Sequence, residues 1–318
     1  MKKVLILFGG NSYEHEISCR SVNFIIKNID VNLFDYELVG IDKNNEWFKV
    51  DKNNIIDINW KNYIINKINN IIEYSKQFDK VFSIIHGNSS EDRKLQSLFE
   101  LNKINYVGCN SYSSLICYDK YLTKLVVGNN VLQVPYIYYS ELIDLEKIEY
   151  PVIIKPCKSG SSIGINVAYD KKQLLEFIKV ANDYDKNIII EKYIKNRREL
   201  ECAILEKGNE LIVSDVGEII TDKWYDYEAK YKNNTDTVIS NIDNNIKELV
   251  KYNSEKLFKL LRCKDFARID FLYDVDEDKL YFNEINTIPG FTEISMYPRL
   301  INNSGIDYKD LITILLFN

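Results

Sequence analysis

Four polar residues near the C-terminal end of the chain could together hold a cation beside a nucleotide. Arg268 and Asp270 stand two positions apart in one apolar run, and Glu284 and Asn286 stand two apart in the next. Side chains alternate along a β-strand, so each pair lies on one face of its strand. If the two runs form a hairpin that pairs even-numbered positions, all four side chains form one patch. Its carboxylate and amide oxygens suit a hard cation such as Mg²⁺, which often bridges protein and nucleotide phosphates.

An ordinary solvated sheet face is the alternative explanation for such a pair of acids. The turn that follows the second run argues against it, because it presents backbone to the same region; its sequence is Thr287-Ile288-Pro289-Gly290. We therefore predict a ligand site on the polar face of this hairpin.

A loop of small residues, Gly160-Ser161-Ser162-Ile163-Gly164, could place backbone N–H groups around a phosphate. It lacks the spacing of a Walker A loop, and a flexible hairpin turn is the commoner explanation for such a loop alone. Lys155 stands shortly before it at the end of a predicted strand, where its ammonium could meet a phosphate. Near the N-terminus, Gly9-Gly10 does not match the dinucleotide-binding fingerprint.

The chain has only two histidines. His15 lies in Glu14-His15-Glu16 and is predicted to be a solvated surface residue. His86 ends a predicted buried strand before Gly87, which makes it the better functional candidate, with a strand-capping histidine as the alternative.

The elements that must position these residues follow from apolar periodicity. In the first third, predicted strands at residues 4–8 and 81–85 alternate with helical patterns such as residues 18–27. This alternation is typical of a parallel α/β sheet, whose ligands bind beyond the carboxyl ends of the strands. Further predicted elements are strands at residues 151–155, 163–168 and 188–193, a hairpin of residues 267–273 and 280–286, and a last helix at residues 308–316.

Composition limits the class of protein. A chain of 318 residues, 46% hydrophobic and 28% charged, is expected to form two or three subdomains around a continuous core. Its net charge of −6 gives no electrostatic reason to expect nucleic acid or an anionic membrane as a partner. No apolar run approaches the roughly 20 residues that span a bilayer. We expect a cytoplasmic protein because its cysteines indicate free thiols in a reducing compartment. The six cysteines contain no C-x-x-C pair, which indicates free thiols rather than a zinc site.

Taken together, these motifs resemble the D-alanine–D-alanine ligases of the ATP-grasp superfamily, from Phe8 to nearly the C-terminus. The resemblance depends on the order and spacing of several segments. They are residues 8–18, His86-Gly87 with Glu91-Asp92, Asp119-Lys120, Lys155-Pro156, and residues 160–164, 191–194, 225–231, 267–270 and 283–298.

The resemblance implies an N-terminal Rossmann-like parallel α/β subdomain followed by a two-subdomain ATP-grasp fold. The expected boundaries are residues 1–108 for substrate binding, 109–191 for the central subdomain and 192–318 for the catalytic C-terminal subdomain. It also implies ATP gripped between the last two subdomains, Mg²⁺ or Mn²⁺ as the cation, and a homodimer. The implied reaction joins two D-alanine molecules through a D-alanyl phosphate, for peptidoglycan precursor synthesis.

The resemblance assigns roles to particular residues around ATP. It implies that two lysines contact phosphates, that three residues hold adenine and that three bind the cation. Compared with the family pattern, one extra residue stands between Ile194 and Glu199, which is matched to the ribose-binding carboxylate. The implied residues are Lys120 and Lys155 for phosphates, Glu191, Lys192 and Ile194 for adenine, Glu199 for ribose, Lys230 for ATP, and Asp270, Glu284 and Asn286 for Mg²⁺.

It also assigns the amino-acid subsites. Glu14 would hold the ammonium of the first D-alanine near His86, and Arg268 with the N–H of Gly290 would stabilise the oxyanion. Ser295 and Met296 would line the second subsite, and a lid would be oriented by Glu14, Ser161 and Tyr231. A closed lid would protect an acyl phosphate from water.

Some positions depart from the family pattern. The family usually has glycine where this chain has Ser89, Ser90, Arg93, Ser97 and Asp265, and Pro-Ala where it has Asn241-Ile242. These are not reacting groups, but they could change loop geometry or lid closure.

Two other functions remain open. A D-alanine–D-lactate or D-alanine–D-serine ligase is the first, and Tyr231 favours the dipeptide enzyme because the resembling depsipeptide ligases lack that lid tyrosine. A degenerate ATP-binding protein without ligase activity is the second. The presence of Lys155, Arg268, Asp270, Glu284 and Asn286 argues against it.

Overall fold

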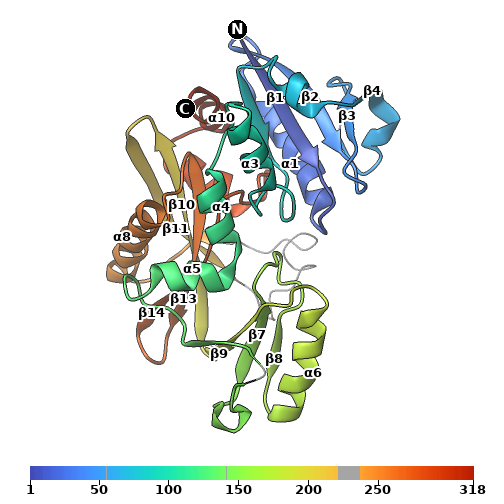
Figure 1. Cartoon of the computed structure of the whole chain (residues 1–318). Coiled ribbons are helices and arrows are strands. Elements are labelled where there is room, and N and C mark those ends of the chain that lie inside the picture. The colour runs from blue at the N-terminus through green and yellow to red at the C-terminus, as the bar shows by residue number, and fades with distance from the viewer. Residues whose placement is uncertain (55, 141, 221–236) are drawn as a thin grey trace.

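The computed structural model describes residues 1–54, 56–140, 142–220 and 237–318, and the strands in these ranges form three sheets (Figure 1). The N-terminal sheet lies at one end of the molecule and a four-stranded sheet at the other, with the C-terminal sheet between them. Helices cover the sheets, and the predicted α/β class is confirmed.

The N-terminal sheet has the strand order β4-β3-β2-β1-β5. Its three parallel strands confirm the predicted parallel sheet, whereas the antiparallel edge made by β3 and β4 was not predicted. Residues 4–8 are completely buried, as expected for a parallel strand covered on both faces. The strands are β1 (Lys2–Gly9), β2 (Phe34–Ile41), β3 (Trp47–Val50), β4 (Ile64–Ile68) and β5 (Lys80–Ser83).

Helices α1 (His15–Asn28), α2 (Ile71–Ser75) and α3 (Lys94–Leu101) and the 3-10 turn η1 (Trp60–Tyr63) accompany this sheet. The predicted helix at residues 18–27 therefore begins three residues earlier. Strand β5 ends at Ser83 rather than at residue 85, so His86 follows the strand instead of ending it.

The four-stranded sheet has the order β6-β9-β7-β8 and is antiparallel. Helix α6 packs on it through Leu174 and Ile178. The predicted strand at residues 163–168 is shorter than expected and begins at Asn166, because Gly164 has a positive φ angle (75°) and the N–H groups of Ile163 and Ile165 bond within the preceding loop. The elements are β6 (Tyr136–Tyr138), η2 (Leu145–Lys147), β7 (Val152–Pro156), β8 (Asn166–Ala168), α6 (Lys171–Asn182) and β9 (Ile188–Lys192).

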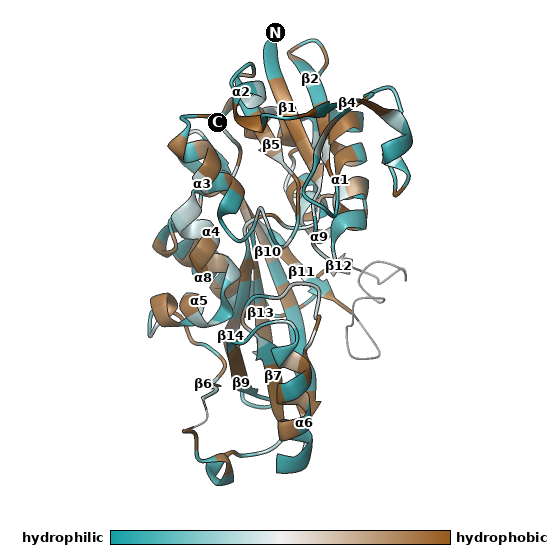
Figure 2. Ribbon diagram, turned by 45° about the vertical axis from the view of Figure 1, so that its right-hand side comes forward, coloured by the Kyte–Doolittle hydropathy of each residue, from teal (hydrophilic) through white to brown (hydrophobic). Residues whose placement is uncertain are grey.

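The C-terminal sheet has the order β12-β11-β10-β13-β14 and is also antiparallel. Helix α8 packs on one face and α9 packs on the other, and α10 packs against α9 and α1. Figure 2 shows both brown and teal residues on helices such as α1 and α6, as expected when one helix face is buried. The elements are β10 (Arg197–Lys207), β11 (Glu210–Ile219), β12 (Thr237–Ile239), α8 (Asn244–Leu260), β13 (Phe266–Asp274), β14 (Lys279–Asn286), α9 (Met296–Asn303) and α10 (Tyr308–Phe317).

The predicted hairpin is confirmed with its register. Arg268 pairs with Asn286 and Asp270 pairs with Glu284, so even-numbered positions face one another. Strand β10 was not predicted, because the charges of residues 195–199 suggested a loop. Arg197 and Glu199 of this strand line the functional cleft described below, and the strand becomes buried from Leu200 onward.

The N-terminal and C-terminal sheets share one hydrophobic core. Phe266 of β13 lies 6.3 Å from Phe82 of β5 and 5.8 Å from Phe291, measured between ring centroids. Loops from the two sheets are therefore held at a fixed distance from each other.

Helices α4 (Ser111–Tyr118) and α5 (Lys120–Val127) connect the first two sheets. Their buried residues Ile116 and Val127 pack in the same core as Leu257 and Phe282 of the C-terminal sheet and its helix. The boundaries at residues 108 and 191 stay a prediction, and this packing attaches both helices to the third predicted subdomain.

All six cysteines are free and buried. Across the described ranges, no helix is both long enough and apolar enough to cross a membrane.

Three of the positions at which the family usually has glycine adopt positive φ angles. The angles are 83° at Ser89, 76° at Arg93 and 62° at Asp265. A residue with a Cβ atom pays roughly 1–2 kcal/mol in this left-handed region. The departures noted in the sequence therefore carry backbone strain rather than a change of fold.

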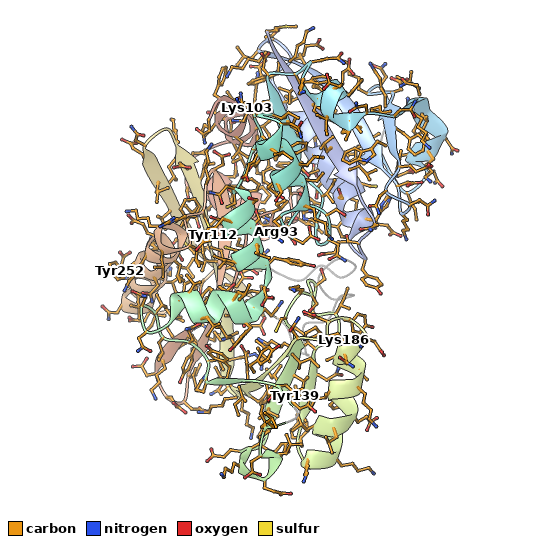
Figure 3. All side chains as sticks on the ribbon, in the orientation of Figure 1. Arg93, Lys103, Tyr112, Tyr139, Lys186 and Tyr252 are labelled. Carbon is orange, nitrogen blue, oxygen red and sulfur yellow. The ribbon has the colours of Figure 1, made fainter. Side chains whose placement is uncertain are left out.

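We predict that Arg93→Gly raises the free energy of unfolding by about 0.5–1 kcal/mol, because relief of strain outweighs the larger entropy of glycine in the unfolded chain. Arg93 is exposed and lies just before α3 (Figure 3). Urea unfolding of Arg93→Gly and Arg93→Ala would test this, since alanine keeps the Cβ atom. An equal gain in both variants would show that the arginine side chain, not the strain, is responsible.

Candidate functional site

A cleft between the four-stranded sheet and the C-terminal sheet gathers most of the predicted phosphate and cation residues. Strand β7 and the loop after it form one wall, and β10, β13 and β14 form the other. The lining residues that matter here are Lys120, Lys155, Ser161, Arg197, Glu199, Asn283 and Glu284.

The acidic patch on β13 and β14 is closely interconnected. Arg268 donates two hydrogen bonds to Asp270, at 2.8 and 2.7 Å, and Asn286 donates to the same carboxylate at 3.0 Å. Glu201 of the neighbouring strand lies 3.0 Å from Nε of Arg268. Glu201 was not predicted, although the alternation of Arg197, Glu199 and Glu201 along one run was a signal for it. The Arg268 guanidinium is thus held between two carboxylates.

Lys155 is held by a buried carboxylate. Its ammonium lies 2.6 Å from Oε2 of Glu191 and donates to Oδ1 of Asn283 at 3.0 Å. The other Glu191 oxygen lies 2.8 Å from the ammonium of Lys124, which is 1% exposed. Burial alone would raise the pKa of Glu191, but the two ammonium groups lower it to about 2. Glu191 was predicted to hold adenine, and in the structure its side chain bridges two lysines.

Lys124 was missed by sequence reasoning. It lies one helical turn after Lys120 on α5, and a lysine on the apolar face of a short helix was the available signal. Lys120 itself donates to the carbonyl of Ser159 at 2.5 Å and lies 3.5 Å from Glu284. The two lysines thus link α5 to the loop of residues 159–164 (the glycine-rich loop), to β9 and to the acidic patch.

The remaining residues predicted for the nucleoside have other partners in the structure. Lys192 pairs with Glu277 at 2.6 Å, and Ile194 is buried in a small apolar cluster. Glu199 borders the cleft and accepts a hydrogen bond from Arg197 at 3.1 Å. Their adenine and ribose roles stay predictions.

The N-terminal subdomain reaches the glycine-rich loop through Glu14. The hydroxyl of Ser161 donates to Oε1 of Glu14 at 2.5 Å. A Cβ atom at Gly160 would lie only 2.9 Å from the other carboxylate oxygen, so this close approach favours glycine. Two of the three residues predicted to orient the lid are thereby in contact. Lys230 and the third of them, Tyr231, lie outside the described residues.

His15 is not a solvated residue, and that prediction is wrong. Its side chain is 6% exposed and is sandwiched between the Gly9-Gly10 turn and Trp60. Nδ1 of His15 lies 2.6 Å from the carbonyl of Gly10, and Trp60 donates to Nε2 at 3.2 Å. The covering indole comes from 45 positions later in the chain, so the flanking glutamates gave no hint of the burial.

His86 is also buried, with both ring nitrogens on protein groups. Nδ1 lies 2.9 Å from the carbonyl of Ile288, and Nε2 lies 3.2 Å from the hydroxyl of Ser21. Burial lowers the pKa of His86, which favours the neutral ring. Contact with a substrate stays a prediction that would require the ring to release one of these partners.

The turn after β14 leads to the residues predicted for the oxyanion and the second subsite. Ser295 accepts a hydrogen bond from the N–H of Thr292 at 3.0 Å, which closes the loop that follows Gly290. Met296 is 6% exposed and begins α9, where it packs against Gly217. Met296 therefore contributes mainly to the core behind this loop.

Glu91 faces the same region from the N-terminal subdomain. It lines a hollow together with Lys120, Gly160 and Glu284, and it accepts the N–H of Gly87 at 2.9 Å. Burial, with the nearby charge of Glu14, raises the pKa of Glu91 to about 8. A protonated carboxyl therefore stands beside the cleft at neutral pH.

Comparison with known proteins identifies the family. The descriptions "D-ala D-ala ligase N-terminus" and "D-ala D-ala ligase C-terminus" match residues 3–109 and 140–317. The chain belongs to the D-alanine–D-alanine ligase family. It is 42% identical to D-alanine–D-alanine ligase B of Clostridium tetani, covering 99% of this chain and 92% of that protein. It is 38% identical to the D-alanine–D-alanine ligase of Acetivibrio thermocellus, covering 99% and 95%.

Solved structures of ligases agree with the fold. The VanG D-Ala:D-Ser ligase of Enterococcus faecalis superposes with a TM-score of 0.87 at 31% identity, over 99% of this chain and 98% of that chain. The D-alanine–D-alanine ligase of Bacillus anthracis complexed with ATP gives 0.78 at 25% identity, over 100% and 97%. The expected ATP-grasp architecture is thereby confirmed.

We predict that Lys124→Met lowers the free energy of unfolding by about 3 kcal/mol, because it leaves the buried Glu191 carboxylate with one cation instead of two. Lys259→Met is the control, since Lys259 forms an exposed pair with Glu255 on α8 that is worth less than about 1 kcal/mol. Urea unfolding of both variants gives the comparison. Equally small losses would contradict a structural role for the buried pair.

A second prediction concerns pH. Because the folded protein raises the pKa of Glu91, this group contributes stability that is complete below the unfolded-state pKa of about 4.5 and is lost as pH rises through about 8. Glu91→Gln mimics the protonated acid, so between about pH 5 and pH 9 the wild-type protein should lose more stability than this variant. Urea unfolding at both pH values measures the difference, and parallel pH dependence would refute it.

Proposed function

We propose that the chain is an ATP-dependent ligase that joins two D-alanine molecules into D-alanyl-D-alanine for peptidoglycan precursor synthesis. One observation carries the proposal: Lys120 and Lys155 face the acidic patch of β13 and β14 across a cleft that Glu14 closes from the N-terminal side. Phosphate-binding cations, a cation site and a carboxylate for an ammonium group thus meet in one place. The near full-length similarity to enzymes of this name supports it.

The chemistry follows from what an amide bond requires. A carboxylate is a poor acyl donor, so the carboxylate of the first D-alanine attacks the γ-phosphorus of ATP, releasing ADP and forming D-alanyl phosphate. The amine of the second D-alanine then attacks the carbonyl carbon, and phosphate leaves. Lys155, Lys120 and Arg268 offset the negative charge that develops on the transferred group and on the oxyanion.

The donor set of the patch fits Mg²⁺ or Mn²⁺. Asp270, Glu284 and Asn286 supply two carboxylates and an amide oxygen from paired strands. Magnesium is commonly bound by one or two carboxylates together with substrate phosphates and water. When bound, the ion would neutralise phosphate charge. Arg268 already orients Asp270 by donating a hydrogen bond to each of its carboxylate oxygens.

The amino-acid subsites are proposed on the same basis. Glu14 would bind the ammonium of the first D-alanine, while the N–H of Gly290 and Arg268 would bind the oxyanion. Ser295 would meet the second D-alanine, with Met296 supporting the loop from the core. The proposal also includes a lid role for Tyr231 with Ser161, a homodimer and a cytoplasmic location. The nucleoside would be bound by Glu191, Lys192, Ile194, Glu199 and Lys230.

The reaction is tested by phosphate release from ATP. D-alanine alone should support turnover and yield D-alanyl-D-alanine by mass spectrometry. Parallel reactions with added D-serine or D-lactate address the similarity to a D-Ala:D-Ser ligase structure. If D-alanyl-D-serine or D-alanyl-D-lactate forms in larger amounts than D-alanyl-D-alanine, the chain is a ligase for that second substrate. If no ADP forms with any of these substrates, the chain is an ATP-binding protein without ligase activity.

The cation site is tested by Asp270→Asn and Glu284→Gln. Each removes one anionic ligand, so turnover should fall at least a hundredfold, or about 3 kcal/mol in the barrier, while the thermal unfolding midpoint changes little. Asp278→Asn is the matched control, because Asp278 lies in the turn of the same hairpin, where it accepts a hydrogen bond from the hydroxyl of Tyr273. Near-normal turnover of both site variants at limiting Mg²⁺ would remove the cation site from this patch.

A further inference from the structure

His86 connects two subdomains through its two ring nitrogens. On one side Nε2 meets Ser21, a completely buried residue in the middle of α1. On the other side Nδ1 meets the carbonyl of Ile288, in the turn between β14 and Gly290. The imidazole therefore spans the gap between the N-terminal sheet and the loop that carries the proposed oxyanion donor.

The partners determine which nitrogen carries the proton. A carbonyl oxygen can only accept, so Nδ1 of His86 must be the donor to Ile288. In a neutral ring Nε2 is then an acceptor, and the hydroxyl of Ser21 must donate to it. The Ile288 carbonyl thus fixes the Nδ1–H tautomer, and the Ser21 hydroxyl holds the ring by donating to Nε2.

Ser21, His86 and Ile288 form a chain of hydrogen bonds, called the relay below. The backbone beside this relay is held by further hydrogen bonds. Ser12 donates to the carbonyl of His86 at 2.7 Å, and Ser12 also accepts the N–H of Glu14 at 3.1 Å. His86 is therefore anchored to the loop that presents Glu14, and through Ile288 to the turn that presents Gly290. A displacement of the ring would move the Gly290 N–H relative to the first substrate.

We propose that Ser21 and His86 are positioning residues that hold the Ile288–Gly290 turn, with Ser21 fixing the orientation of the histidine ring through Nε2. This rests on the proposed function, in which the Gly290 N–H stabilises the oxyanion. It differs from a direct contact between His86 and the first D-alanine, because both ring nitrogens are used by the protein. Loss of Ser21 should then affect the reaction step more than substrate binding.

His15 provides an internal reference for this relay. Its Nδ1 donates to the carbonyl of Gly10 and its Nε2 accepts from Trp60, so it must be the same neutral tautomer. Since the chain has only two histidines, a protein labelled with ¹⁵N-histidine gives two sets of ring signals. His86→Gln assigns them by removing one set.

The first test is the ring ¹⁵N–¹H NMR spectrum of the labelled protein. In the wild-type chain both histidines should show the Nδ1–H tautomer. In Ser21→Ala the Nε2 signal of His86 should shift, because this acceptor nitrogen loses its hydrogen bond, while the Nδ1–H tautomer and the His15 signals stay unchanged. An Nε2–H tautomer of His86 in the wild-type protein, or unchanged His86 signals in the variant, would overturn the role of Ser21.

The second test separates positioning from substrate contact by steady-state kinetics. Ser21→Ala should lower kcat about tenfold to a hundredfold, as expected when a catalytic donor is misplaced, with KM for the first D-alanine changed less than twofold. Ser254→Ala removes another buried helix hydroxyl, which donates to the carbonyl of Val250 in α8 and also interacts with Cys202 of β10, and it should keep normal kcat. A raised KM at unchanged kcat would assign substrate contact to His86, and kinetics equal to those of Ser254→Ala would reject positioning.

Failure of the proposed function would look different from failure of this inference. If the wild-type chain forms no dipeptide, the kinetic test has no signal and the oxyanion role of Gly290 falls with it, whereas the NMR test still decides the tautomer. If the dipeptide forms and only the Ser21→Ala results disagree, the ligase assignment stands and the relay does not.

Discussion

The register between β13 and β14 is the constraint on which the site depends. Pairing Asp270 with Glu284 puts both carboxylates on one face, and the same strand then reaches every other part of the site. Asn283 contacts Lys155, Glu284 approaches Lys120, and the turn beyond β14 meets His86 through Ile288. A slip of one residue would turn all of these side chains to the opposite face. One hairpin thus sets the positions of groups from three sheets.

Charge compensation explains how so many ionised groups can stand in a narrow cleft. These buried cations of the cleft have carboxylates within ion-pair distance: Lys124 and Lys155 share Glu191, and Arg268 lies between Glu201 and Asp270. Unpaired, any of these charges would cost several kcal/mol to bury. Because the lysines are held in place before phosphate binds, little reorganisation is needed when negative charge develops during phosphoryl transfer.

Features set by local periodicity could be predicted, and features set by distant packing could not. Alternation alone gave the polar face of the hairpin, and the order of short motifs gave the family. By contrast, the burial of His15 depends on Trp60, which lies far away in the sequence. The ion pair between Lys124 and Glu191 could not be predicted either, because it joins a helix to a distant strand. The strand β10 was missed because its charged residues face a cleft rather than solvent. Positive φ at Arg93 and Asp265 likewise became visible only with the backbone.

The six buried thiols make local opening of this protein measurable one region at a time. Burial raises the pKa of Cys19 and of Cys157 to about 12, so neither presents a reactive thiolate while its surroundings stay closed. Cys19 lies in the core shared by the N-terminal and C-terminal sheets, and Cys157 lies at the start of the loop that cradles Ser161. Alkylation of each thiol under native conditions therefore proceeds at the rate at which its own region unfolds transiently. The alkylation rate of Cys19 therefore reports transient opening of the shared core, and that of Cys157 reports transient opening of the loop over the cleft.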